Sequence, residues 1–335
     1  MVIGAIIIIG AVGEQATRSA PQIGRPQVVE GPLGCVEILG RSVVERMVQR
    51  FLSADVKAVS VLADARVALP SLYQSSDKVT AQVVDHMGSA LSRTLQDYSE
   101  RGIGFAFVAH ADVYTECDLI DWIWFHRGTH QAMTRACDHN GSLDFWVVDC
   151  AKREDVELSS LIEADRRFEC PSYFIKEYVN QVTTATDVRR LVTDVFRGRC
   201  EMRPSGQEIR PGVWVEAGAQ IHRRARIVAP AYVGCGTQVR EDTLVTRCSS
   251  LESACYIDYG TVIEDSSILS NSYVGIWLDV SHALVKGNKL ANVQRDVMLE
   301  ISDRSVMREK VAIARHSMQD LSGSRSGRLR FASLS

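Results

Sequence analysis

A six-residue periodicity in the second half of the chain restricts the possible folds more than any other feature of the sequence. Stepping by six from Val215 meets an aliphatic residue at every position as far as Leu269. The residues in this series are Val215, Ile221, Ile227, Val233, Val239, Val245, Leu251, Ile257, Ile263 and Leu269. Aliphatic residues make up only about a quarter to a third of ordinary sequence, so this run does not arise by chance.

A second series runs in step with the first. Four residues after each aliphatic position lies a small residue, from Ala219 to Ser267, and only the last member, Tyr273, is large. Neither the helical period of about 3.6 nor the strand period of about 2 produces this pattern. It is the hexapeptide repeat of a β-helix, in which each hexad supplies a short strand and a tight corner, and three hexads complete a coil.

The repeat predicts a solenoid over residues 211–290, with about four coils. The register slips by one after Tyr273, where Val274 and Val280 continue the series. The ends of a solenoid need caps. Because the segment 294–320 is amphipathic and mostly free of Gly and Pro, residues 291–335 are expected to form a capping helix and a flexible tail.

Residues 1–205 alternate predicted strands and helices, which indicates an open, largely parallel α/β sheet. The first residues, MVIGAIIIIGAV, lack a basic segment, and polar residues follow at once, so a buried strand is favoured over a secretory signal. A helix begins after Ser42, which forms a capping-box pattern with Glu45. Further strands are predicted over 56–62 and 103–108, further helices over 78–100, 118–130 and 186–197, and a hairpin over 132–149.

The composition excludes several classes of function. Lys and Arg total 38 against 41 for Asp and Glu, so no basic excess exists to neutralise a nucleic-acid backbone. No apolar run reaches the roughly 20 residues of a membrane helix. The nine cysteines show no C-x-x-C spacing. We therefore expect reduced thiols in a cytoplasmic protein that neither binds nucleic acid nor inserts into a membrane.

Two places in the first half are candidates for phosphate or metal binding, because ligands bind beyond the carboxyl ends of strands in open α/β sheets. The loop after the first strand contains Gly10, Gly13, Thr17 and Arg18. Its glycines would admit phosphate to the backbone and its arginine would neutralise the charge, although a flexible surface loop has the same composition. Asp112 follows the strand 103–108 and could hold Mg²⁺, or it could be a solvated loop residue or a helix cap.

An α/β domain followed by a hexapeptide solenoid resembles the nucleotide-sugar pyrophosphorylases (sugar-phosphate nucleotidylyltransferases). The strand AIIIIG followed by AVGEQATR is similar to the family's first strand and glycine-rich loop, and HADVYTECDL (110–119) is similar to its segment with the metal-binding Asp. ILGRSVVERMVQRF (38–51) looks like its helix-entry segment. The resemblance implies a Rossmann-like nucleotidyltransferase domain over residues 1–205 and a left-handed parallel β-helix over 211–290.

The resemblance also assigns site residues by position. It implies a catalytic role for Arg18 and a Mg²⁺-binding role for Asp112. The implied nucleotide-binding residues are Gly10, Ala11, Gly13, Thr17 and Asp112.

The chain departs from the family at its lysine motifs. Where the family has Pro-Lys-Pro the chain reads GRPQ, which leaves Arg25 as the candidate cation. Lys152 lies in the region of the family's Glu-Lys-Pro motif, within DCAKRED. GVWVEAG is similar to the family's Trp-x-Asp-x-Gly pattern, which would make Glu216 a ligand of the second metal. Val215 and Glu216 also fit the hexad register, and we favour the interpretation that they belong to the repeat.

The implied activity is nucleotidyl transfer between a nucleoside triphosphate and a sugar 1-phosphate, which supplies polysaccharide or cell-envelope synthesis. The alternative is a non-catalytic relative that binds a sugar nucleotide or regulates a partner. A third class, the hexapeptide acyltransferases, needs a histidine base, and His222 and His282 lie in or beside the coils. Because the edges of solenoids expose backbone groups, we also expect a homo-oligomer.

Overall fold

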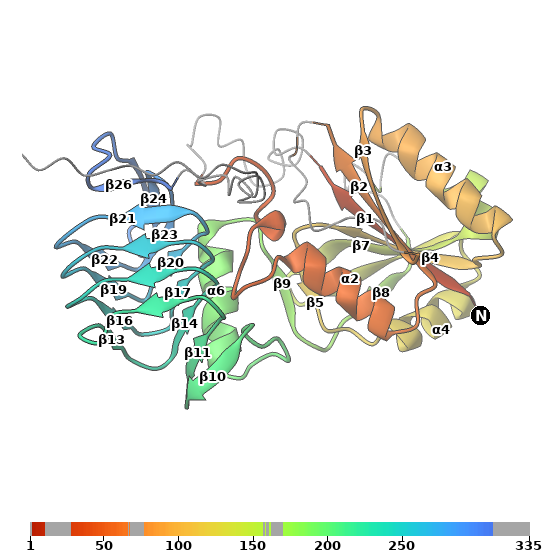
Figure 1. Ribbon diagram of the computed structural model, residues 1–335. Coiled ribbons are helices and arrows are strands. Elements are labelled where there is room, and N and C mark those ends of the chain that lie inside the picture. Colours follow the sequence, from red (N-terminus) through yellow and green to blue (C-terminus); the bar gives the residue numbers. More distant parts are fainter. Residues whose placement is uncertain are drawn as a thin grey trace, which may run out of the picture.

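The structure is a computed structural model that describes residues 2–10, 28–65, 67, 77–156, 158, 161 and 170–310. In Figure 1 the sheet and the helices that cover it lie at the right, and a stack of short strands lies at the left. Helix α6 (Ala185–Phe196) lies between the two parts. The chain is a mixed α/β protein in which the C-terminal half forms a parallel β-helix.

The seven-stranded sheet is largely parallel, as the alternation of elements predicts. Its strands lie in the order β3-β2-β1-β4-β7-β6-β8. Within it, β7 runs antiparallel to both of its neighbours, and the other pairings are parallel. The strands are β1 (Ile3–Ile9), β2 (Ala58–Asp64), β3 (Val79–Val84), β4 (Phe105–His110), β6 (Met133–Asp138), β7 (Gly141–Asp149) and β8 (Ser172–Phe174).

The first strand is buried on both faces of the sheet, which explains its apolar sequence. Ile7 and Ile9 pack into a core with helices α2 and α4, whereas Ile6 and Ile8 pack into a second core with helix α3. The expected strand at the start of the chain and the expected hairpin over 132–149 are both confirmed. The three helices are α2 (Val43–Ser53), α3 (Met87–Glu100) and α4 (Leu119–Thr129).

Helix α2 begins with the predicted capping box. The Glu45 N–H donates to Ser42 Oγ over 3.1 Å, and the Ser42 N–H donates to Glu45 Oε2 over 2.6 Å. Replacing Ser42 with Ala removes the first of these bonds. We expect the Ser42→Ala variant to lose about 1 kcal/mol of unfolding free energy. Urea unfolding followed by circular dichroism measures this loss, and an unchanged midpoint would contradict it.

The prediction of one long helix over 78–100 is wrong. Strand β3 occupies Val79–Val84 at the edge of the sheet, and α3 begins only at Met87. Val79, Thr80 and Val83 are β-branched and favour extended backbone. Because an edge strand is only partly buried, its mixed polar and apolar residues imitate the pattern of an amphipathic helix.

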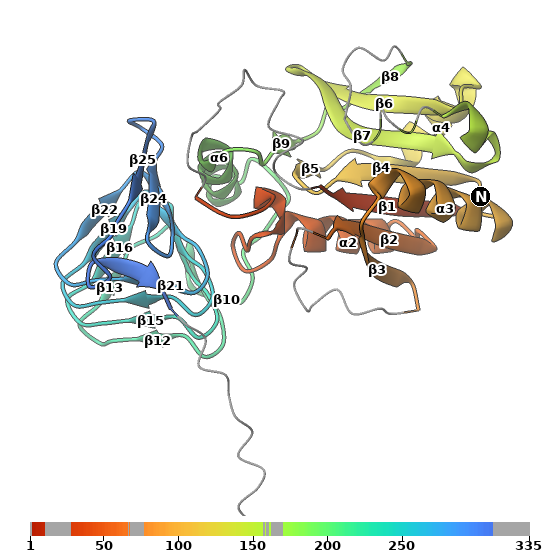
Figure 2. The same ribbon diagram turned by 90° about the horizontal axis from the view of Figure 1, so that it is seen from above.

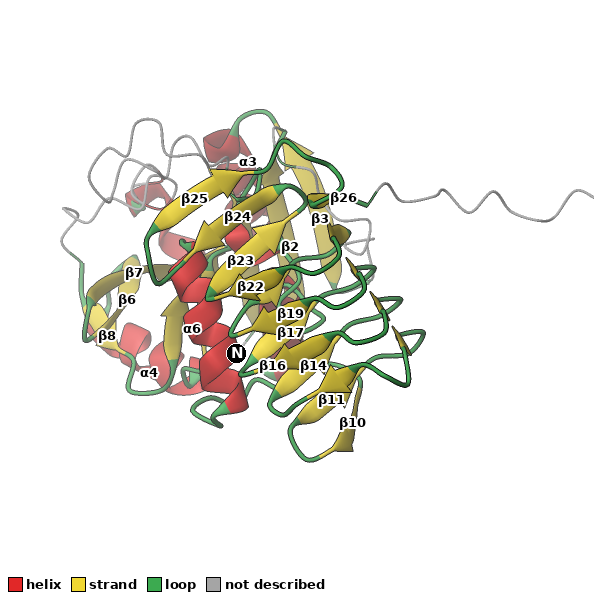
Figure 3. Cartoon of the chain, turned by 90° about the vertical axis from the view of Figure 1, so that its left-hand side faces the viewer, coloured by secondary structure: helices red, strands yellow, loops and turns green. Residues whose placement is uncertain are grey.

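The hexapeptide segment forms three ladders of short parallel strands, one on each side of a solenoid with a triangular outline (Figure 2). Val215 pairs with Val233, which pairs with Leu251, and each step is one coil. Figure 3 shows the ladder from β10 (Gln207–Arg210) to β25 (Val297–Glu300). The parallel strands of the first ladder are β11 (Val213–Val215), β14 (Ala231–Val233), β17 (Ser249–Leu251), β20 (Ser267–Ile268) and β23 (Ala283–Lys286). Those of the second are β12 (Gln220–Ile221), β15 (Gln238–Val239), β18 (Tyr256–Ile257) and β21 (Ser272–Val274). Those of the third are β13 (Arg226–Ile227), β16 (Leu244–Thr246), β19 (Val262–Glu264) and β22 (Asp279–Ser281).

The two series of the repeat have the expected places in the coils. Aliphatic residues such as Val239 and Ile257 fill the interior. Small residues occupy the corners, where their polar groups bond the backbone of the next coil. Thr237 Oγ1 donates to the carbonyl of Glu252 over 2.6 Å, and Thr243 Oγ1 donates to that of Asp258 over 3.1 Å. A larger side chain would not fit these buried corners.

The register slip occurs one hexad earlier than the sequence suggests. Leu251 pairs with Ile268, not with Leu269, so the coil has already lost one residue before β20. Ile268 fills the solenoid interior, whereas Leu269 packs with Tyr232 into the core of the α/β half. Two adjacent aliphatic residues with opposite orientations explain why the sequence alone misplaces the slip.

The predicted C-terminal capping helix is wrong for the part of it that the structure describes. Residues up to 310 form strands instead, and residues 311–335 lie outside the described residues. β24 (Lys289–Asn292) pairs with β23, β25 (Val297–Glu300) pairs with β24, and β26 (Met307–Glu309) pairs with β21, all antiparallel. The last coil leaves backbone donors and acceptors unpaired, and these strands pair with them, which a helix cannot do.

Helix α6 joins the α/β half to the solenoid. Its Leu191 and Val192 belong to the same buried core as Phe107 of the sheet and Leu284 of the solenoid. Arg189 donates to Ser267 Oγ over 2.7 Å and pairs with Asp265 over 2.6 Å. Among the described residues, no helix is both long and apolar enough to cross a membrane.

Candidate functional site

The strand order places a ligand-binding edge between β1 and β4. β2 and β3 lie on one side of β1 and β4 lies on the other, so the direction of strand succession reverses between β1 and β4. Ligands bind beyond the carboxyl ends of strands at such a reversal. Gly10 follows β1 and Asp112 follows β4. Ile8 pairs with His110, so the chain leaves β1 and β4 at the same edge of the sheet, and Asp112 lies in the turn after β4.

Asp112 is a half-buried residue held from two directions. Its carbonyl oxygen accepts a hydrogen bond from the Val182 N–H over 2.7 Å, which ties it to the start of the segment leading to α6. The short helix η1 (Leu33–Cys35) lies against the residue before it, because a Cβ on Gly34 would lie 1.9 Å from the Ala111 carbonyl oxygen. Only glycine fits this approach, so Gly34 fixes the wall of the site.

Cys35 lies within electrostatic reach of Asp112. Burial raises the pKa of the Cys35 thiol to about 12, and the charge of Asp112 contributes in the same direction. The thiol is therefore mainly protonated at neutral pH. All nine cysteines are free thiols, as the sequence predicts.

The donor set fits a hard cation that is held mainly by its substrate. No group of three His, Cys, Asp or Glu side chains in the described part of the chain could hold a metal ion by itself. Mg²⁺ does not need such a cage, because it is usually bound by one or two carboxylates together with water and substrate phosphates. Asp112 can supply one such carboxylate at the edge where a phosphate would lie.

The structure does not bring Lys152 to this edge. β7 runs antiparallel to β4 with Asp149 opposite Phe105, so the helix η2 (Cys150–Asp155) lies beside the start of β4, whereas Asp112 follows its end. A strand of 6 residues spans about 20 Å. Lys152 Nζ donates to the His130 carbonyl over 2.6 Å. Lys152 and Asp112 therefore do not share a site.

The remaining site residues from the sequence belong to the loop after β1. Ala11, Gly13, Thr17, Arg18 and Arg25 lie outside the described residues, so the roles assigned to them stay predictions.

A contact between the site wall and the solenoid escapes the sequence analysis. The connecting segment, residues 33–41, contains Gly34 and continues to the solenoid. There Glu252 accepts hydrogen bonds from the Leu39 N–H over 2.9 Å and the Gly40 N–H over 3.0 Å. Glu37 Oε2 accepts from Ser253 Oγ and from Ser270 Oγ, each over 2.5 Å. The solenoid thus holds the segment that forms one wall of the candidate site.

Glu252 is an unusual residue for a solenoid corner. Its side chain is almost completely buried, and burial raises its pKa to about 8, with a smaller contribution from the charge of Glu37 and opposition from the two backbone donors. Charged residues also follow other aliphatic positions of the repeat, such as Glu216, Asp258 and Glu264, so no local signal in the sequence distinguishes Glu252. Its partner segment lies more than 200 residues away, with a sequence separation of 213.

The other acidic and basic candidates take part in local contacts. Glu216 Oε2 accepts from the Cys235 N–H over 3.0 Å within the coils, in agreement with the hexad interpretation. His222 Nδ1 accepts from the Arg224 N–H over 3.3 Å. His282 Nδ1 lies 2.7 Å from Asp265 Oδ2, on the side of the solenoid that faces α6. These contacts do not assemble an acyl-transfer site around either histidine.

Comparison with known proteins adds no family to this geometry: no model of a known protein family matches the chain, and no curated protein sequence is significantly similar to it.

Proposed function

We propose that the chain is a divergent sugar-1-phosphate nucleotidyltransferase, with a Rossmann-like catalytic domain and a left-handed β-helix. The observation that carries the proposal is the position of Asp112, a carboxylate in the turn after β4 at the strand reversal between β1 and β4. This is the edge at which α/β sheets bind phosphorylated ligands. The order of an α/β half and a hexapeptide solenoid, which resembles the nucleotide-sugar pyrophosphorylases, supports the same function.

In the proposed reaction a phosphate oxygen of the sugar 1-phosphate attacks the α-phosphorus of a nucleoside triphosphate. A new P–O bond forms, the bond between the α-phosphorus and the bridging oxygen breaks, and pyrophosphate leaves with the bonding electrons. Mg²⁺ would neutralise charge on the phosphates when bound. Asp112 would hold it, the loop after β1 would contact the triphosphate through its glycines and Arg18, and Arg25 would contact the sugar phosphate. Lys152 has no part in this proposal because it lies at the opposite edge.

The test is a pyrophosphate-release assay on the full chain. Four nucleoside triphosphates are crossed with a panel of sugar 1-phosphates, with Mg²⁺ and then with excess chelator. We expect release for at least one pair, and its loss with chelator. Folded protein that releases no pyrophosphate with any pair would overturn the proposal.

The position of Lys152 gives a prediction within the same assay. Lys152 lies at the opposite edge from Asp112, so its ammonium group does not contact the phosphates in the proposed site. We therefore expect Lys152→Ala to keep the pyrophosphate-release rate within about twofold of the wild-type rate. A loss of two or more orders of magnitude would place the reaction elsewhere in the fold.

The distance of Lys152 from the site also favours a second candidate, a relative that binds a sugar nucleotide without catalysis. Lys152, the residue that the sequence offers for the role of the family's Glu-Lys-Pro lysine, lies away from the proposed phosphate edge. Thermal shift with finished sugar nucleotides tests this candidate. Stabilisation by a sugar nucleotide, without pyrophosphate release from any substrate pair, would support binding alone. The first proposal also includes three expectations: a homo-oligomer, a cytoplasmic location and a role in polysaccharide or cell-envelope synthesis.

A further inference from the structure

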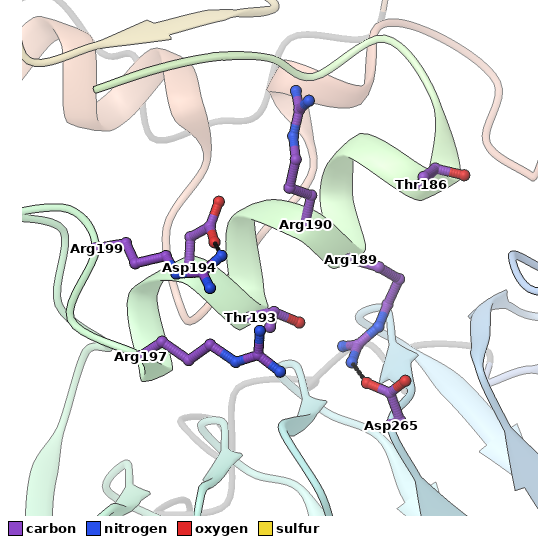
Figure 4. Close-up of a pocket in the computed structure, with 8 residues that line it drawn as sticks. All are labelled: Thr186, Arg189, Arg190, Thr193, Asp194, Arg197, Arg199 and Asp265. Carbon is purple, nitrogen blue, oxygen red and sulfur yellow. Dashed lines mark hydrogen bonds and ion pairs between the residues drawn. The ribbon is translucent and has the colours of Figure 1, made fainter. Parts of the chain in front are cut away.

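A cavity lies between helix α6 and the solenoid, away from the candidate site at the sheet edge. Figure 4 shows this cavity of about 270 Å³ and the side chains around it. Four arginines and two aspartates line it: Arg189, Arg190, Arg197, Arg199, Asp194 and Asp265. The guanidinium groups outnumber the carboxylates by two, so the cavity has a positive excess in a chain whose net charge is −3.

The helix places two of these arginines and a hydroxyl on one face. Arg189, Thr193 and Arg197 follow one another at intervals of four residues, so they lie along the same side of α6. Arg189 and Arg197 extend toward the solenoid, and Arg190 extends in another direction (Figure 4). The helical wall therefore presents the exposed guanidinium of Arg197 and the hydroxyl of Thr193, whereas the guanidinium of Arg189 is buried against the solenoid.

The ion pairs of the cavity leave one cation without a partner. Arg189 pairs with Asp265 over 2.6 Å, Arg199 with Asp194 over 3.0 Å, and Arg190 with Asp187 over 3.2 Å. Arg197 forms no ion pair with a described residue and is exposed. A cation near the end of a helix is favourable in itself, which explains one arginine but not a cavity with four.

Hydrogen bonds hold Arg189 of α6 against the solenoid side of the cavity. Arg189, which is 4% exposed, also donates to the Cys248 carbonyl over 3.0 Å and to Ser267 Oγ over 2.7 Å. Asp265 is bonded on its other oxygen to His282 Nδ1 over 2.7 Å. These bonds neutralise Asp265 and fix Arg189, so the free guanidinium of Arg197 faces a preformed polar surface.

We propose that this cavity binds an anion of the phosphate class, separately from the candidate site at the sheet edge. Guanidinium groups match the geometry of phosphate oxygens with two parallel hydrogen bonds, and Thr193 can donate a third. The volume exceeds that of a water-sized void and admits either free phosphate or a small phosphate monoester. A bound anion would bridge α6 and the solenoid. This site does not depend on the proposed nucleotidyl transfer.

The experiment is isothermal titration of the full chain, without Mg²⁺, with inorganic phosphate, pyrophosphate and glycerol 3-phosphate in separate runs. We expect binding of at least one of them, and Arg197→Gln to weaken it about tenfold or more, since one charge-assisted hydrogen bond has that effect on affinity. Tighter binding of glycerol 3-phosphate would identify a phosphate ester as the ligand, and tighter binding of phosphate or pyrophosphate the free anion.

Two control variants keep the result specific. Arg93→Gln removes an exposed arginine from α3 and should leave the affinity unchanged, and Asp112→Asn should leave it unchanged because Asp112 lies at the other site. Because Arg197 is exposed, its variant is expected to keep the melting temperature of the wild type. The absence of binding at millimolar concentrations, or binding that is lost in Asp112→Asn and kept in Arg197→Gln, would overturn the proposal.

Discussion

Asp112→Asn is expected to reduce pyrophosphate release by a factor of about 100 or more. The substitution keeps the size of the side chain and removes its charge, so it removes the only carboxylate proposed to hold Mg²⁺ on the phosphates. Loss of one preorganised electrostatic contact to a transition state typically costs about 3–4 kcal/mol, which corresponds to this factor. The measurement is the initial rate at saturating substrate over a series of Mg²⁺ concentrations.

The control for this variant is Asp97→Asn, which removes an exposed carboxylate that pairs with Arg101 over 3.0 Å on α3. It should retain the wild-type rate, since exposed pairs of this kind contribute little. The midpoint of urea unfolding should be similar in both variants and the wild type. If Asp112→Asn is folded and keeps its rate at every Mg²⁺ concentration, Asp112 is not a ligand and the proposed site is wrong.

The solenoid could be predicted almost completely because its physics repeats along the chain. Each inward residue, such as Val239 or Ile257, meets its equivalent from the next coil, so the constraint recurs every coil and becomes visible in one sequence. The slip at Ile268 and Leu269 could not be placed, since both residues are buried, one in the solenoid and the other against the α/β half. Periodicity predicts that both residues are buried, but it does not predict whether each lies in the solenoid core or in the core of the α/β half.

The two wrong helices have a common cause. The strands β3, β25 and β26 each lie at the edge of a sheet. Their residues are therefore mixed, with Val297 and Leu299 exposed and Met307 buried. Such a pattern does not separate a helix from a strand. The outcome depends on backbone groups of β2, β21 and β23 that a local reading of the sequence does not contain.

The residues of the candidate site also differ in whether a local sequence pattern can identify them. Asp112 could be identified because its position after a buried strand is a local property of the sequence. The contact between Glu252 and the segment that carries Leu39 and Gly40 joins distant parts of the chain and leaves no local pattern. The solenoid is consequently more than an appended unit: through Glu252 it holds the connecting segment that begins at the wall of the Asp112 site.

Glu252→Ala is therefore expected to lower the unfolding free energy by about 2–5 kcal/mol. The variant leaves the N–H groups of buried Leu39 and half-buried Gly40 without acceptors, and each such group costs about 1–3 kcal/mol when it is buried. Urea unfolding at pH 6, followed by tryptophan fluorescence, measures the loss. A loss below about 0.5 kcal/mol, the range of ordinary surface substitutions, would show that solvent replaces Glu252 and that the solenoid does not hold the segment.

The Glu252→Gln variant separates the charge of this residue from its shape. The folded-state pKa of about 8 lies above the ordinary value of 4.5, so the folded protein holds a proton that the unfolded chain releases. The resulting stabilisation is complete below about pH 4.5 and declines by at most about 1.4 kcal/mol per pH unit until it is lost near pH 8. Glutamine is uncharged like the protonated carboxyl, but its amide nitrogen cannot accept the second of the two N–H bonds. Glu252→Gln should therefore unfold at a somewhat lower urea concentration than the wild type at pH 5 and at a higher one at pH 9. Parallel urea midpoints across this range would show that Glu252 does not titrate between the folded and unfolded states.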